Sequence, residues 1–239
     1  MPDTPFRTER GQRVPQVTAA EMRRVDEVAV EETGPRLLQM MENAGRNLAR
    51  NAIAARPGLR EVTVLAGPGG NGGGGLCAAR HLANHGLDVT VVLDRDPAEL
   101  GGATATQWET LAAMGIERAV EARAAVAEAD VTIDALLGYS LDGPPRDRIG
   151  ELVDIAAKSS YLVSLDVPSG VDATTGERPG VVVEPDRTLT LALPKTGLTD
   201  LAGPVYLGDI GIPKVVYDRV GIDYESPFEG EYVLPLVVE

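Results

Sequence analysis

The sequence predicts an α/β fold built on a mainly parallel central sheet that helices cover on both faces. Two observations favour this class. From Val62 onward, short apolar runs alternate with segments of helical periodicity, which is typical of parallel strands joined by crossover helices. The first apolar run leads directly into a glycine-rich turn and then a helix. The 239 residues are enough for one such domain, which we expect over 17–239.

The segment before the first strand is expected to hold an arm and two helices. Residues 1–16 are polar and interrupted by proline, so we expect a flexible N-terminal arm. Thr18 and Glu21 have the spacing of a capping box, which predicts a helix over about 18–32. A second helix is predicted over 35–55. Two such helices are an addition to a plain nucleotide-binding fold, and they could cover a sheet edge or form a dimer contact.

The remaining elements follow from the alternation of apolar runs and helical periodicity. The predicted strands are 62–66, 88–93, 131–136, 161–166 and 187–193, with a shorter one near 204–207. The predicted helices are 74–86, 103–114, 121–129 and 147–158. Ligands bind beyond the carboxyl ends of the strands in sheets of this kind, so functional loops are expected to follow strand ends.

A run of glycine follows the first of these strands. From Gly70 to Gly75 every position but Asn71 is glycine. Glycine lets the backbone come close to a ligand, and the free amides of a helix start attract anions, so the run predicts a phosphate cradle. The alternative is a tight strand-to-helix turn. No lysine follows, which excludes a P-loop, and Asp94 and Asp96 are only loosely placed for the acid of a dinucleotide fingerprint.

The composition disfavours several function classes. A formal net charge of -14 disfavours nucleic-acid binding through a basic surface. The single cysteine, Cys77, rules out an internal disulfide and fits a reducing compartment. No apolar run approaches the ~20 residues of a transmembrane helix, and no signal peptide is recognised. We therefore expect a soluble, cytoplasmic protein without nucleic-acid or membrane partners.

Two aspartates stand at the ends of apolar strands. Asp166 is the strongest acid–base candidate, although it could instead cap the following turn. Asp134 lies inside a buried strand, where a charge needs a partner. A bound cation is one such partner, and Arg146 is the other candidate.

Three further side chains carry weaker signals. His81 and His85 lie at the i, i+4 spacing of a metal pair, but no carboxylate or thiol joins them at ligand spacing. Cys77 is interpreted as a small buried side chain rather than a nucleophile. Lys195 ends a strand on the expected ligand side, where it could meet a phosphate or lie on the surface.

Several motifs follow one another along the chain: MENAG from Met41, GPGGNGGGGL, IDALLG, SLDVPSGVDATTG, LPKTGL and GDIGIP. Their order resembles the YjeF N-terminal domain family, which includes the NAD(P)H-hydrate epimerases, from about Val17 to Tyr217. The resemblance implies a three-layer αβα Rossmann-like sandwich, a homodimer, and interconversion of the R and S epimers of hydrated NADH or NADPH. It also implies functional coupling to an ADP- or ATP-dependent hydrate dehydratase that acts on the S form.

Carried over position by position, the resemblance also implies site residues. The implied substrate contacts are Gly70, Asn71, Gly72, Gly73, Gly74, Gly138, Tyr139, Ser140, Leu141, Asp142, Gly143, Pro144 and Asp166. The implied ligands of a potassium ion (K+) are Asn71, Asp134 and Ser169. The chemistry is inversion at a carbinolamine carbon, by acid-assisted loss of hydroxide to an iminium and return of water on the other face. Asp166 would serve as acid and base in turn.

The chain departs from the family at one loop. The family usually has N-N-G-G-D-G there, and this chain has Gly70 and Gly74 in place of the first Asn and the Asp. A carboxylate that contacts the ligand is thereby lost, and turnover could be weakened while backbone amides still bind. The retained Asp134 and Asp166 favour a working or weakened epimerase. The lost carboxylate favours a non-catalytic nucleotide-binding or scaffold domain of the same fold.

Overall fold

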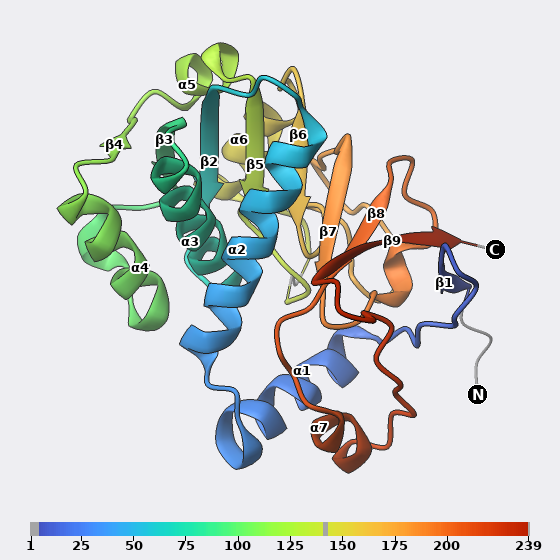
Figure 1. Ribbon diagram of the computed structural model, residues 1–239. Coiled ribbons are helices and arrows are strands. Elements are labelled where there is room, and N and C mark those ends of the chain that lie inside the picture. Colours follow the sequence, from blue (N-terminus) through green and yellow to red (C-terminus); the bar gives the residue numbers. More distant parts are fainter. Residues whose placement is uncertain (1–4, 141–142, 239) are drawn as a thin grey trace.

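One mainly parallel sheet organises the molecule (Figure 1). The computed structural model describes residues 5–140 and 143–238. Across the sheet the strands are β1 (Phe6–Thr8), β9 (Val233–Val238), β8 (Val205–Gly208), β7 (Arg187–Leu191), β6 (Leu162–Leu165), β5 (Val131–Ala135), β2 (Glu61–Ala66), β3 (Asp88–Leu93) and β4 (Glu117–Arg118). Neighbouring strands from β8 to β4 are parallel, and β9 runs antiparallel to both β8 and β1. The predicted fold class is confirmed.

Helices cover both faces of this sheet. They are α1 (Ala19–Glu27), α2 (Leu37–Ala55), α3 (Gly70–Asn84), α4 (Gly102–Ala113), α5 (Ala122–Glu128), α6 (Asp147–Ala156) and α7 (Lys214–Arg219), with a π-helical segment at Val28–Thr33 and short 3-10 turns at Pro97–Glu99 and Thr196–Leu198. Within the described ranges, none of the helices has the length and apolar character that a membrane span requires.

The alternation of side chains along β2 separates the two helical layers. Val64 and Ala66 pack among residues of α2 and α3, whereas Leu65 packs among residues of α5 and α6. Successive side chains of a strand point to opposite faces of the sheet, so both faces of β2 are buried. A third cluster, at the β8 and β9 end of the sheet, is covered by α1 and α7.

The strand order reverses between β2 and β5. From β2 the sheet continues through β3 and β4 on one side and through β5 to β8 on the other. The connections that follow β2 and β5 therefore leave the sheet in opposite directions and open a crevice at the carboxyl ends of these strands. In open α/β sheets this is the place where ligands bind.

The N-terminal segment differs from the flexible arm expected over 1–16. Residues 6–8 form β1, which pairs with β9, and Phe6 is fully buried among apolar side chains at that edge. The expectation of an arm is wrong for these residues, because a short strand in a polar segment has no local signal. The strand β9, which contains Pro235, was not predicted either.

The glycine run also differs from its prediction. Helix α3 begins at Gly70, so the run forms the first turns of the helix rather than a loop before it. A Cβ atom at Gly72 would lie 1.8 Å from the Gly67 carbonyl oxygen, and one at Gly75 would lie 2.4 Å from Ala135 Cβ. Close packing of α3 on the ends of β2 and β5 therefore requires glycine here, independently of any ligand.

Substitution within the run should separate packing from ligand binding. Gly72→Ala should lower the free energy of unfolding by about 1–3 kcal/mol or more, because the added methyl group meets backbone atoms. A Cβ at Gly70, in the same helix, would have no neighbour within 4 Å, so Gly70→Ala is the matched control and should leave stability unchanged or slightly higher. Urea unfolding of both variants measures the difference, and equal stability would contradict the packing role.

Candidate active site

A cavity of about 380 Å³ lies in the crevice between β2 and β5. Its wall includes Pro68 to Asn71 at the start of α3, Leu136 to Ser140 after β5, and Asp166 after β6. Met40 and Met41 of α2 supply an apolar side, and Asp26 of α1 supplies another acidic group. The cavity thus joins a helix N-terminus, two carboxyl groups and an apolar wall.

The predicted substrate contacts fall into three groups. Those that line the cavity are Gly70, Asn71, Gly74, Gly138, Tyr139, Ser140 and Asp166. Those that do not line it are Gly72, Gly73, Gly143 and Pro144. Two more, Leu141 and Asp142, lie outside the described residues. A Cβ at Gly69 or Gly70 would meet no atom within 4 Å, so the helix start leaves room for a ligand at its free amides.

Asp166 is held in a rare backbone conformation. Its φ is 66°, and Val167 N donates to Leu165 O at 2.9 Å across it, which makes Asp166 the central residue of a γ-turn. Ala192, at the end of the adjacent β7, has the same arrangement with a φ of 61°. Left-handed γ-turns at residues other than glycine are strained, and they persist where surrounding contacts enforce them.

Lys195 supplies the main contact of Asp166. Its Nζ forms a short ion pair with Asp166 Oδ1, and it also donates to Leu191 O at 2.9 Å. The side chain of Lys195 is 1% exposed and that of Asp166 is 7% exposed. The alternative that Lys195 lies on the surface is therefore wrong, and its contact with a phosphate stays a prediction.

The second oxygen of Asp166 is available to a ligand. In the described part of the chain, the hydrogen bonds to this carboxylate reach Oδ1, from Lys195, Leu191 N and Thr190 Oγ1. Because Asp166 also lines the cavity, Oδ2 is left to accept or donate a proton there. The carboxylate is thus held through Oδ1, and Oδ2 takes no hydrogen bond from the described residues.

Asp134 is fully buried and held by neutral donors. Ser164 Oγ and Ser169 N donate to its Oδ2 at 2.8 and 2.9 Å, and Ser169 Oγ and Leu136 N donate to its Oδ1 at 2.6 and 3.3 Å. Burial raises the pKa of Asp134, and these hydrogen bonds lower it by less. Arg146 is exposed, and within the described ranges the hydrogen bonds of Asp134 come from Ser164, Ser169 and Leu136 instead. These four hydrogen bonds, from Ser164, Ser169 and Leu136, tie the end of β5 to β6 and to the segment after it.

Two of the residues named as potassium ligands, Asn71 and Ser169, meet at the backbone of Leu137. Asn71 Nδ2 donates to Leu137 O at 2.7 Å, and Leu137 N donates to Ser169 Oγ at 3.0 Å. Among the described residues Asn71 Oδ1 accepts no hydrogen bond, and the Ser169 hydroxyl can turn its proton. Amide, hydroxyl and carboxylate oxygens are the donors that hard cations take. The donor set fits an alkali ion in kind.

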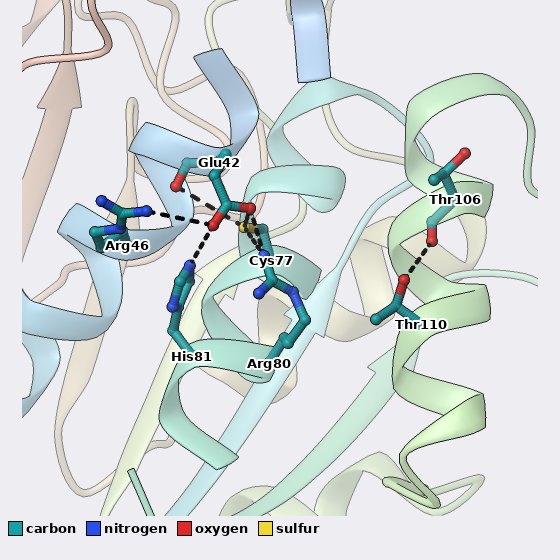
Figure 2. A network of polar contacts seen from close by, with 7 residues as sticks. All are labelled: Glu42, Arg46, Cys77, Arg80, His81, Thr106 and Thr110. Atoms are coloured by element: carbon teal, nitrogen blue, oxygen red, sulfur yellow. Dashed lines mark hydrogen bonds and ion pairs between the residues drawn. The ribbon is translucent and has the colours of Figure 1, made fainter. Parts of the chain in front are cut away.

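A separate polar cluster joins α2 to α3 (Figure 2). Glu42 forms a short ion pair with Arg80, its Oε1 lies 2.9 Å from His81 Nε2, and the Cys77 thiol donates to its Oε2 at 3.4 Å. A carboxylate and a thiol therefore do lie beside His81, contrary to expectation, whereas His85 is not part of the group. Because Arg80 already compensates the charge of Glu42, we interpret this cluster as a polar contact between helices.

Cys77 is fully buried, which confirms its interpretation as a small buried side chain. Burial raises the pKa of Cys77 to about 12, and the negative charge of Glu42 adds to the effect. The thiolate is the nucleophilic form of cysteine. The thiol therefore stays protonated at neutral pH and contributes packing rather than nucleophilic chemistry.

Asp26 is an acidic cavity residue that the sequence did not predict. It lies on α1 among other charged residues, and nothing in its local pattern separates it from a solvent-facing acid. In the structure its Oδ2 accepts a short hydrogen bond from the Tyr139 hydroxyl. Only the tertiary contact with the segment after β5 reveals its position.

Comparison with known proteins agrees with this geometry. A family profile described as YjeF-related protein N-terminus matches residues 37–197. The crystal structure of the yeast protein ynu0 shares the fold, with a TM-score of 0.82 at 23% identity over 93% of this chain and 100% of that one. The chain belongs to the YjeF N-terminal family.

The chain matches two named relatives over different shares of their length. The chain is 51% identical over 239 residues to a protein of Dehalogenimonas lykanthroporepellens named NAD(P)H-hydrate epimerase. This match covers 97% of this chain and 96% of that protein. It is 47% identical over 199 residues to a protein of Hyperthermus butylicus named bifunctional NAD(P)H-hydrate repair enzyme Nnr. That match covers 79% of this chain but 37% of the longer protein.

Proposed function

We propose that the protein is an NAD(P)H-hydrate epimerase, an isomerase that interconverts the R and S epimers of hydrated NADH and NADPH. The observation that carries the proposal is the 51% identity, over nearly the full length of both chains, to a protein with that name. The cavity supports it independently. Asp166, whose backbone is strained and whose Oδ2 is free of hydrogen bonds from the described residues, lines the same cavity as a helix N-terminus that suits a phosphate group.

The proposed pose places the two ends of the substrate on different parts of the cavity. The pyrophosphate would lie at the amides of Gly69 and Gly70, where the backbone is open. The hydrated nicotinamide ring would lie against Met40 and Met41, with its carbinolamine carbon near Asp166. Binding energy from the phosphates would thus position the reacting carbon at the carboxylate.

Asp166 would handle the proton of the water that leaves or enters. Loss of the hydroxyl group from the carbinolamine carbon leaves an iminium, and water returning to the opposite face gives the other epimer. Proton transfer by a positioned carboxyl group contributes typically 10²–10⁴-fold to such a step. The ion pair with Lys195 would hold the Asp166 carboxylate in place for this transfer.

The ion, the partner, the assembly state and the location are finer parts of the proposal. Asn71 and Ser169 would hold a potassium ion, which would supply positive charge beside the buried Asp134. The longer relative named as a bifunctional repair enzyme supports coupling of this activity to a hydrate dehydratase. We also propose a cytoplasmic homodimer, for which the exposed Leu38 and Ile53 of α2 offer an apolar contact.

A coupled assay tests the activity. With R-hydrate as substrate and a dehydratase specific for the S form, we expect turnover to depend on this protein. Asp166→Asn should lower the rate roughly a hundredfold or more. That change leaves Lys195 buried without its counter-ion, which costs about 3–5 kcal/mol of stability. The double variant Asp166→Asn/Lys195→Met removes both charges of the pair and leaves no unpaired buried ammonium group. It is therefore the control for loss of activity through unfolding.

The assay also distinguishes the competing interpretation. Wild-type protein that binds the hydrate without accelerating epimerisation would support a non-catalytic nucleotide-binding domain. A folded Asp166→Asn variant as fast as wild type would remove Asp166 from the mechanism.

Potassium binding should appear as stabilisation of the native state. Replacing choline chloride with potassium chloride at equal ionic strength should raise the melting temperature, and potassium at 100 times its dissociation constant would contribute about 2.7 kcal/mol. Asn71→Ala should abolish the increase, whereas Asn84→Ala, at the exposed end of α3, should retain it. Identical melting curves in the two salts would argue against a potassium site.

Restoring the family's carboxylate tests whether its loss slows turnover. A Cβ at Gly74 would lie 2.9 Å from Leu165 Cδ2, the end of a flexible side chain that can shift. Gly74→Asp should raise the epimerisation rate above wild type if this acid is limiting. Gly74→Asn has the same shape without the charge, and equal rates for the two variants would show that the carboxylate has no part in turnover.

A further inference from the structure

The cavity that holds Asp166 also contains a second carboxyl group. Asp26 is placed there by α1, and its Oδ2 accepts the hydrogen bond of the Tyr139 hydroxyl, 113 residues along the chain. The ring of Tyr139 in turn lies 5.8 Å from Lys195 Nζ. Two carboxyl groups and a phenol therefore line one cavity, and the ammonium group of Lys195 lies near the phenol ring.

The two carboxyl groups have different surroundings. Asp166 faces the ammonium group of Lys195 in an ion pair. Burial raises the pKa of Asp26, and the negative charge of Asp166 raises it further, while the Tyr139 hydrogen bond and Lys195 lower it by less. Two carboxyl groups in such different surroundings commonly divide the roles of acid and base between them.

Tyr139 is suited to pass a proton between Asp26 and the cavity. Burial raises the pKa of Tyr139, and the negative charges of Asp26 and Asp166 add to this effect, whereas Arg23 opposes it. Tyr217 of α7 also faces the charge of Asp26, and burial raises its pKa too. The Tyr139 hydroxyl therefore keeps its proton unless Asp26 supplies another in its place.

We propose that Tyr139 is a second catalytic residue for the epimerisation and that Asp26 is a positioning residue that supplies its proton. The inference rests on the proposed function. Tyr139 gives its hydroxyl proton to the departing hydroxyl group, and the C–O bond breaks with its electron pair on oxygen. The lone pair of the ring nitrogen forms the C=N bond, and the carboxyl proton of Asp26 moves to the Tyr139 oxygen.

Water then returns from the side of Asp166. Its oxygen forms the new C–O bond, the C=N electron pair returns to nitrogen, and Asp166 accepts the released proton through Oδ2. One water leaves, one enters, and one proton has passed from Asp26 to Asp166. The reverse reaction begins in that protonation state. Inversion thus needs both Tyr139 and Asp166, because water leaves on one side and enters on the other. Exchange of the hydroxyl oxygen with retention of configuration needs only one of them.

The test compares inversion with oxygen exchange, starting from each hydrate epimer in isotopically labelled water. Tyr139→Phe should lower kcat for inversion roughly 10²–10⁴-fold with little change in KM. One epimer should still exchange its hydroxyl oxygen with retention, through Asp166. Tyr161→Phe, just before β6 at the opposite end of the strands, is the matched control and should keep the wild-type rate. Thermal unfolding establishes that each variant is folded.

Asp26→Asn tests the supply of the proton. For the epimer whose hydroxyl group faces Tyr139, the active form of Asp26 is protonated, so wild-type kcat in that direction should fall as pH rises through the raised pKa of Asp26. Asp26→Asn should lower kcat and remove this fall, which a merely structural change would leave in place. A fall that persists unchanged in the variant would overturn the role of Asp26.

The outcomes also separate this inference from the function on which it rests. An active wild type whose Tyr139→Phe variant inverts at the wild-type rate would overturn the inference alone. Loss of exchange from both epimers in parallel with inversion would do the same, because it indicates a single group. A wild type without epimerase activity would overturn the proposed function and the inference with it.

Discussion

Helix α3 can lie against the sheet only because Gly72 and Gly75, in its first turns, carry no side chains. Gly72 and Gly75 contact the backbone and side chains at the ends of β2 and β5 so closely that a methyl group has no room. This contact brings the free amides of the helix start to the point where the strand order reverses. The cavity therefore depends on a packing requirement, and the room for a ligand at Gly69 and Gly70 is its consequence.

Holding the Asp166 carboxylate in its position lowers the stability of the folded protein. Two strained γ-turns end β6 and β7, and the ion pair between Asp166 and Lys195 is almost fully removed from water. Desolvation makes such a buried pair a weak source of stability. Strain and buried charge persist together where the surrounding structure enforces them, and they cluster at functional sites. Here they fix one oxygen of Asp166 and leave the other free.

The central strands were predictable because parallel strands buried on both faces need continuous apolar runs. The positions of the cavity loops followed from the rule that ligands bind beyond the carboxyl ends of parallel strands. The glycine run was placed in a loop because glycine disfavours helices, but tertiary packing overrode that propensity. The burial of Lys195 was missed since its partner, Asp166, lies on another strand end. Asp26 had no local signal, because only the contact between α1 and Tyr139 brings it into the cavity.

The pairing of β1 with β9 has a consequence for how the chain is made. Phe6 leaves the ribosome long before Val233, so this edge of the sheet can close only after all the strands between them have been made. Until then β8 is an open edge, with unpaired backbone groups that can recruit other chains. The crevice between β2 and β5 needs neither terminal strand. The nascent protein can therefore assemble its cavity while the edge that prevents aggregation is still missing.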